Sequence, residues 1–338
     1  MITKFGCKNI KAIQDFDEID IYPITIIMGE NSSGKSSLLQ ALSFLSVNII
    51  YGNSINRIKY NNPFSQFGNS NSFKNSGDEV VLSFEIDSKQ QIKLIYQDEN
   101  LEYGFLSKIE SNPPIEKDEA LNILEKELEV IRHIGKLKDK KETYDYTLDY
   151  IGYFGENFKQ RVTSLKNTRF IKNTMKEIFN YDFVIDKRKQ ELFINIDNKK
   201  LELSMFGTSI SSTIPILTQF ALNRQTEIKD KYRLTIIEEP ELNLHPKSQA
   251  KFIEVILNNI PKKHSTIIET HSDHIINKLA SLISSKKVKY KDVVIYYKIK
   301  NSKFQKIEFN KCGQFVGNFP TGFFDATLDD IYNLKLDC

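Results

Sequence analysis

The feature that most restricts the fold of this chain is the segment GENSSGKS, from Gly29 to Ser36. It fits the pattern G-x-x-x-x-G-K-[ST], and it lies between the apolar run ITIIM and the helix-like run SSLLQALSFLSV. Such a loop, between a buried strand and a helix N-terminus, presents backbone N–H groups to an anion. The pattern therefore predicts a phosphate-binding loop in an α/β protein. The alternative is a chance turn rich in Gly and Ser.

The residue types of this loop predict how it would hold a nucleotide. Lys35 would reach the β- and γ-phosphates, and the Ser36 hydroxyl would bind Mg²⁺. The expected cofactors are ATP and Mg²⁺. The residues predicted to contact them in this loop are Gly29, Asn31, Ser32, Ser33, Gly34, Lys35, Ser36 and Ser37.

Strands and helices alternate in the second half of the chain. The strands RLTIIEE, STIIET and DVVIYYKIK are separated by the helical patterns KSQAKFIEVILNNI and SDHIINKLASLISS. This alternation predicts a parallel sheet covered on both faces. Two further regions, EVVLSFEID with QQIKLIYQD and the segment 182–206, have the pattern of antiparallel strand pairs.

Two regions have other patterns. Residues 51–77 are rich in Asn, Ser and Gly and are expected to be loop. Residues 116–180 are expected to form a helical lobe, in which Leu121, Leu124, Leu128 and Ile131 share one helical face. We interpret the basic stretch RHIGKLKDKK within it as a solvated face, with contact to nucleic acid as the alternative.

Two adjacent carboxylates, Glu238 and Glu239, end the apolar strand in IIEEPELNLHP. Strand ends meet at one edge of a doubly wound sheet, so this pair is expected to face the phosphate loop. Glu238 would then lie near Mg²⁺, through water, and Glu239 would orient or deprotonate a water molecule at the γ-phosphate. The alternative is a solvated helix start, because acidic residues favour first turns.

Three segments together resemble a known family. ITIIMGENSSGKSSLLQAL, IIEEPELNLHP and TIIETHSDHII are similar to the ABC-type ATPase heads of the RecF, Rad50 and OLD group. The resemblance implies that Glu239 is the catalytic glutamate and that His271 is the switch histidine that senses the γ-phosphate. Glu238 stands where the family usually has Asp, and His245 stands at the D-loop position. A zinc site at HSDH is disfavoured because no Cys or His cluster completes four ligands.

The same resemblance implies composite sites in a dimer. GTSISSTIP is similar to the family's signature loop, with Gly207, Ser211 and Pro215 as matches and Ser209 and Ser212 as departures. In ABC proteins this loop contacts ATP held by the other subunit, which implies a two-fold dimer around two nucleotides. A helix N-terminus with Ser capping is the alternative. Gln66 is our choice for the Q-loop residue, a further ligand of Mg²⁺.

The C-terminal segment FVGNFPTGFFDATLDDIYNL carries a narrower resemblance. It is similar to the WPxGFFD ending of a bacterial subfamily of unknown function, whose relatives resemble Septu- and retron-associated antiphage ATPases. The segment is expected to dock on the sheet, with a partner-binding site as the alternative.

The expected fold is α/β: an ABC-type ATPase head with a mainly parallel sheet core, an antiparallel β subdomain and a helical insertion. We expect an N-terminal ATPase lobe with the phosphate loop, a helical insertion, a C-terminal ATPase lobe and a tail, at residues 1–110, 111–182, 183–298 and 299–338. The expected function is an ATPase that dimerises around Mg-ATP and controls a separate effector, such as a nuclease, in antiphage defence. A RecF-like DNA repair ATPase and an ATP-binding scaffold with little turnover are the alternatives.

Bulk properties limit the partners and the compartment. The net charge of +3 neither requires nor excludes DNA or RNA as a partner. Three scattered cysteines indicate reduced thiols in a cytoplasm. The longest apolar run, ALSFLSVNII, is half the roughly 20 residues that a membrane span needs, so no membrane contact is expected.

Overall fold

The structure is a computed structural model that describes residues 1–50, 54–60, 79–98, 103–135, 149–196, 199–225 and 232–317. The strands of its main sheet are β3 (Ile24–Gly29), β8 (Ile131–Ile134), β12 (Arg233–Glu238), β13 (His264–Glu269), β14 (Val293–Lys298), β15 (Gln305–Phe309) and β16 (Phe315–Val316). Their order is β16-β15-β14-β3-β13-β12-β8. The five strands from β14 to β8 run parallel, and β15 and β16 extend the sheet antiparallel at one edge.

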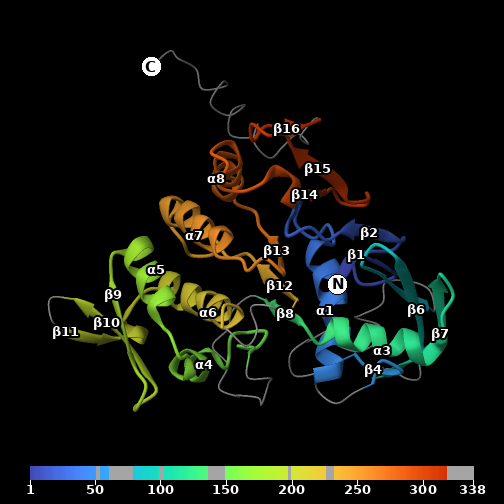
Figure 1. Ribbon diagram of the computed structural model, residues 1–338, viewed down its shortest axis with the longest axis horizontal. Helices are drawn as coiled ribbons and strands as arrows, with labels where there is room; N and C mark the ends of the chain where they lie inside the picture. The colour runs from blue at the N-terminus through green and yellow to red at the C-terminus, as the bar shows by residue number, and fades with distance from the viewer. Residues whose placement is uncertain are drawn as a thin grey trace.

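Helices cover both faces of the main sheet (Figure 1). The helices in the described residues are α1 (Lys35–Ile50), α3 (Lys117–Leu128), α4 (Phe158–Ser164), α5 (Arg169–Phe179), α6 (Thr208–Asn223), α7 (Pro246–Asn258) and α8 (Asp273–Ser284). Successive side chains of β3 point to opposite faces, so Ile27 joins the cluster of Leu42 on α1, whereas Ile26 joins that of Leu279 on α8. Burial on both faces explains why these strands are continuously apolar.

Two antiparallel sheets flank the main sheet on opposite sides (Figure 1). One contains β1 (Ile2–Lys8), β2 (Asp17–Asp20), β4 (Arg57–Lys59), β5 (Glu79–Ile86), β6 (Gln90–Asp98) and β7 (Tyr103–Asn112), in the order β2-β1-β5-β6-β7-β4. The other contains β9 (Asp182–Asp186), β10 (Glu191–Ile196) and β11 (Lys199–Glu202), with β10 in the middle.

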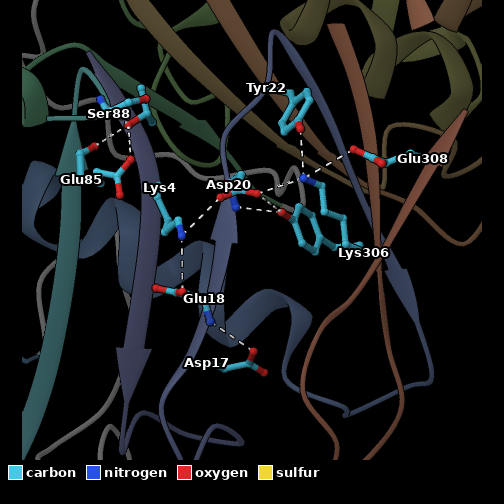
Figure 2. A network of polar contacts seen from close by, with 11 residues as sticks. Lys4, Asp17, Glu18, Asp20, Tyr22, Glu85, Ser88, Lys306 and Glu308 are labelled. Atoms are coloured by element: carbon cyan, nitrogen blue, oxygen red, sulfur yellow. Dashed lines mark hydrogen bonds and ion pairs between the residues drawn. The ribbon is translucent and has the colours of Figure 1, made fainter. Parts of the chain in front are cut away.

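A polar network joins the six-stranded sheet to β15 (Figure 2). The Lys306 ammonium lies 3.1 Å from the Asp20 carboxylate and donates to the Tyr22 hydroxyl over 2.9 Å. Lys4 of β1 lies 3.6 Å from the same carboxylate. These groups are partly exposed, so each pair stabilises the junction by only about 0–1 kcal/mol. The network therefore orients the six-stranded sheet relative to β15 but contributes little to the free energy of folding.

The predicted fold class is confirmed, but the segment predicted as a helical lobe also contains a strand of the main sheet. Residues 131–134 form β8, which pairs with β12, so the prediction that Ile131 shares the helical face of Leu121, Leu124 and Leu128 is wrong. Arg132 and His133 are buried rather than solvated. Their pattern was misleading because two polar side chains interrupt a short apolar strand. The boundaries of the four predicted domains remain a prediction.

Three further expectations concern a predicted loop, two predicted motifs and membrane contact. The predicted loop 51–77 contains the short strand β4, which pairs with β7. Gln66 and the GFFD motif lie outside the described residues. No helix in the part of the chain that the structure describes is long and apolar enough to cross a membrane.

A buried ion-pair network holds β8 against β12. The Asp149 carboxylate lies 2.8 Å from the Arg132 guanidinium and 2.7 Å from that of Arg233. Burial alone would raise the pKa of Asp149, but the two guanidinium groups outweigh it and lower the pKa to about 2. Since Arg132 precedes His133, this network also fixes the position of His133.

We expect Asp149→Asn to lower the free energy of unfolding at pH 7 by about 3–5 kcal/mol, because two buried cations lose their counter-charge. The folded pKa lies below the ordinary value of 3.8, so the carboxylate's contribution is complete above that pH and is lost as the pH falls toward 2. Urea unfolding at pH 7 and pH 3 should show a smaller acid loss for the variant than for the wild type.

The matched control is Asp182→Asn, which removes an exposed carboxylate paired with Lys176. It should change the free energy of unfolding by less than about 1 kcal/mol. Equal effects of the two substitutions would contradict a structural role for the buried network.

Candidate functional site

The predicted phosphate loop connects β3 to α1, as its sequence requires. Gly29 and Gly34 have φ angles of +134° and +109°, which side-chain-bearing residues rarely adopt. A Cβ on Gly29 would also lie 2.0 Å from the Lys298 carbonyl oxygen on the neighbouring strand β14. The two glycines thus let the loop turn back tightly over the end of the sheet.

Two polar side chains of the loop, Lys35 and Ser33, are buried. The Lys35 ammonium is buried and donates to the carbonyl oxygens of Gly29 over 3.0 Å and Glu30 over 2.6 Å. The Ser33 hydroxyl is buried and has no hydrogen-bond partner among the described residues. A buried hydroxyl without a partner is costly, and an oxygen of a bound phosphate would satisfy it. The loop therefore fits the phosphate group of a nucleotide.

The two carboxylates of IIEEP diverge at the end of β12. Glu238 is the last residue of the strand and is 5% exposed. Glu239 has a φ of +45°, and its N–H donates to the Glu269 carbonyl over 2.8 Å. A left-handed conformation is uncommon for a residue other than glycine and is often found at functional sites. This backbone turn separates the two carboxylates, in addition to the alternation of strand side chains that the sequence predicted.

Glu238 is held by a buried network that the sequence did not predict. Its Oε1 lies 2.9 Å from His133 Nε2 and accepts from the Tyr153 hydroxyl over 3.2 Å. The other ring nitrogen of His133, Nδ1, lies 2.6 Å from Ser43 Oγ on α1. The network joins β12, β8 and the helix that follows the phosphate loop. The Glu238 carboxylate is therefore fixed in orientation.

A third carboxylate, Glu269 at the end of β13, lies at the phosphate loop. The Ser36 hydroxyl donates to Glu269 Oε1 over 2.8 Å, and Glu269 is 2% exposed. Glu238 is its register partner on β12, so the two acids are neighbours on adjacent strands. Burial, and next the charge of Glu238, raises the pKa of Glu269 to about 7, although Ser36 and Lys35 oppose the shift.

His271 also belongs to this edge of the sheet. Donor atoms of His271, Glu239 and Glu269 all lie within 4.8 Å of one another, an arrangement that can hold a metal ion. The His271 N–H donates to Glu241 Oε1 over 2.7 Å, which fixes the backbone before α8. The structure thus brings together four predicted residues, Lys35, Ser36, Glu239 and His271, at the ends of adjacent parallel strands.

The residues predicted for the second subunit lie on the surface. Gly207 is the N-cap of α6 and Ser211 is exposed on its first turn, so GTSISSTIP begins a helix rather than forming an extended loop. His245 is the N-cap of α7, and its Nδ1 accepts from the Lys247 N–H over 3.3 Å. The Ser212 hydroxyl donates to the Leu242 carbonyl over 3.4 Å, which ties the start of α6 to the segment before His245.

Sequence reasoning missed three residues of this site. Glu269 had the same signal as Glu238, an acid at the end of a buried strand, but the motif that resembles the family at this position points to His271. His133 belongs to the stretch RHIGKLKDKK, whose sequence indicated a solvated basic face. Lys11, which donates to Gln40 over 2.7 Å, gave no signal. Burial lowers the pKa of Lys11 to about 8, and the charge of Glu238 opposes this shift.

Comparison with known proteins identifies a family whose model matches the sequence and solved structures of similar fold. A family profile described as "AAA domain, putative AbiEii toxin, Type IV TA system" matches residues 24–277. Comparison with curated proteins finds no significant match.

Solved structures with a similar fold include two SMC heads. One is an SMC head bound to the C-terminal winged-helix domain of ScpA. It matches with a TM-score of 0.56 and 13% identity, and the match covers 92% of this chain and 98% of that chain. Another is an SMC head with an extended coiled coil bound to the C-terminal domain of ScpA, from Pyrococcus furiosus. It matches with a TM-score of 0.51 and 12% identity, and the match covers 91% of this chain and 96% of that chain. At this identity the similarity establishes the fold alone.

Proposed function

This chain belongs to the AAA-domain family that the matching profile defines, and we propose that it binds ATP with Mg²⁺, hydrolyses it and dimerises around it. The observation that carries the proposal is the meeting of the phosphate loop with Glu239, Glu269 and His271 at one edge of the parallel sheet. A P-loop NTPase needs these parts: an anion cradle, oxygen ligands for a hard cation and a group that positions water.

The residues of this chain have distinct tasks in the proposed reaction. Lys35 and the loop N–H groups bind the β- and γ-phosphates, and Ser36 binds the metal. Mg²⁺, when bound, neutralises the charge that develops on the phosphates. Glu239 accepts a proton from the attacking water, and His271 orients the γ-phosphate. Glu238, anchored by His133 and Tyr153, keeps Glu239 in place by fixing the end of β12.

The exposed start of α6 supports a composite site. Gly207 and Ser211 lie on a helix N-terminus, where free N–H groups and the helix dipole attract a phosphate. An added Cβ on Gly207 would meet no atom of the described residues within 4 Å, so none of these residues covers this position. We propose that Gly207, Ser211 and His245 face the nucleotide held by a second copy of the chain.

We further propose that dimer closure and opening control a separate effector, such as a nuclease, in antiphage defence. The support is the family's description as a toxin of a toxin–antitoxin system, together with SMC heads whose structures hold a bound partner protein. ATP turnover measured with and without DNA tests the proposal that the chain controls a separate effector. Turnover that DNA does not stimulate agrees with it, strong stimulation by DNA alone favours a repair ATPase, and ATP binding without turnover indicates a scaffold.

Mixed dimers test the composite site. Ser211→Arg should block hydrolysis while ATP binding stays near wild type, because the bulky cation obstructs only the partner's nucleotide. Mixing it with Lys35→Ala protein should restore part of the activity, because one of the two composite sites is then intact. Phosphate release from mixtures, with mixed dimers verified by native mass spectrometry, measures this. No recovery in verified mixed dimers would contradict the two-fold arrangement.

A further inference from the structure

We propose that Glu269 is the direct carboxylate ligand of the divalent cation at the phosphate loop, beside Ser36. This inference rests on the proposed function, because it names a residue of the same site. It assigns the direct metal contact to Glu269 on β13, whereas the sequence predicted only that Glu238 on β12 lies near the ion through water.

The distance between Ser36 and Glu269 is the first argument. Ser36 Oγ lies 2.8 Å from Glu269 Oε1. Two neighbouring ligands of an octahedral Mg²⁺, each about 2.1 Å from the ion, lie about 3 Å apart. The two oxygens are thus already spaced as adjacent ligands, so no large movement is needed to bind the ion.

The unsatisfied half of the Glu269 carboxylate is the second argument. Glu269 Oε2 is buried and has no hydrogen-bond partner among the described residues. Glu269 is only 2% exposed, so bulk water does not supply that partner. Glu238, its register partner on the adjacent strand β12, adds a second acid one strand spacing of about 5 Å away. Buried acids side by side are unfavourable unless a cation lies between or beside them. A hard divalent cation, which prefers oxygen ligands, would give Oε2 a partner and offset the repulsion between the two acids.

The fixed position of Glu238 is the third argument. His133 and Tyr153 both bind its Oε1, which leaves it less able to follow a metal ion than Glu269. Glu239, by contrast, is only partly buried and lies near the exposed His271, so a water molecule can reach it. The three glutamates therefore have separate roles: Glu269 binds the ion, Glu238 orients the site and Glu239 acts on water.

Binding of Mn²⁺ in place of Mg²⁺ tests this assignment without using turnover. The free Mn²⁺ signal in electron paramagnetic resonance gives the Kd of the ion for protein saturated with ADP. Glu269→Gln should raise this Kd at least about tenfold, which is what even the loss of an outer-shell partner produces. Glu269→Asp keeps the charge and shortens the reach, so its Kd should lie between those of the wild type and Glu269→Gln. Glu238→Gln should raise the Kd by less than Glu269→Gln does.

ATP binding in EDTA separates the two proposals. Without metal, Glu269→Gln should bind ATP at least as tightly as the wild type, because a negative charge beside the phosphates is removed. Wild-type Mn²⁺ affinity in both Glu269 variants, or a larger loss in Glu238→Gln, would overturn the assignment. If the wild type itself bound no ATP, with or without metal, the proposed function would fail instead. Should Glu269→Gln not fold, Glu269→Asp decides the question, and a wild-type Kd overturns the proposal.

Discussion

Glu239→Gln is expected to lower the rate of ATP hydrolysis by about 10²–10⁴-fold while ATP binding is retained. The amide has the shape of the carboxylate but cannot accept a proton from water. The backbone should be unaffected, because the turn at Glu239 is held by its own N–H bond to the Glu269 carbonyl. Phosphate release at saturating ATP measures the rate, and calorimetry measures the affinity.

The matched control is Glu308→Gln, which makes the same chemical change at an exposed residue of β15. Its rate should equal that of the wild type. Raising Mg²⁺ should leave the rate of Glu239→Gln unchanged, because Glu239 acts on water rather than on the ion. A rate for Glu239→Gln within about twofold of wild type would contradict the role of Glu239 as the group that accepts a proton from water.

Lys35→Ala is the second large effect that we expect. Its ammonium is buried against the carbonyl oxygens of the phosphate loop, where a phosphate contact is charge-assisted. Hydrogen bonds to charged groups contribute about 1.5–3 kcal/mol, so ATP affinity should fall by about 10- to 150-fold. Calorimetry with ATP measures the loss, and circular dichroism should confirm that the fold survives.

Lys291→Ala removes an exposed lysine before β14 and serves as its control. ATP affinity in this variant should equal that of the wild type. Equal affinity in Lys35→Ala and the wild type would place nucleotide binding elsewhere and contradict the assignment of the phosphate loop.

The parts of the fold that were predictable are those with local signals. The phosphate loop has a fixed pattern, and the strands around it are apolar on both faces, so Gly29, Lys35 and the parallel sheet could be derived from spacing alone. The pair Glu238 and Glu239 could be placed at the strand end for the same reason. Their divergence through a left-handed residue could not, because φ at Glu239 depends on its bond to β13.

The parts that were missed depend on contacts between distant segments. His133 reaches Glu238 across 105 residues of sequence, and Ser36 reaches Glu269 across 233. No periodicity in the chain encodes which acid faces which hydroxyl. The strand β8 was missed because Arg132 and His133 pair with Asp149 and Glu238, partners that only the folded sheet supplies. Polar residues in a strand are therefore a signal for buried networks as well as for surface.

The mass of Glu239→Gln protein in solution tests the central claim, a head that closes around Mg-ATP, most directly. Light scattering on a size-exclusion column should give twice the 39.2 kDa chain mass with Mg-ATP, since the variant binds ATP but cannot hydrolyse it. With ADP, or with ATP and the Lys35→Ala substitution added, the mass should return to that of one chain. A mass that is the same with ATP, with ADP and without nucleotide would contradict the account.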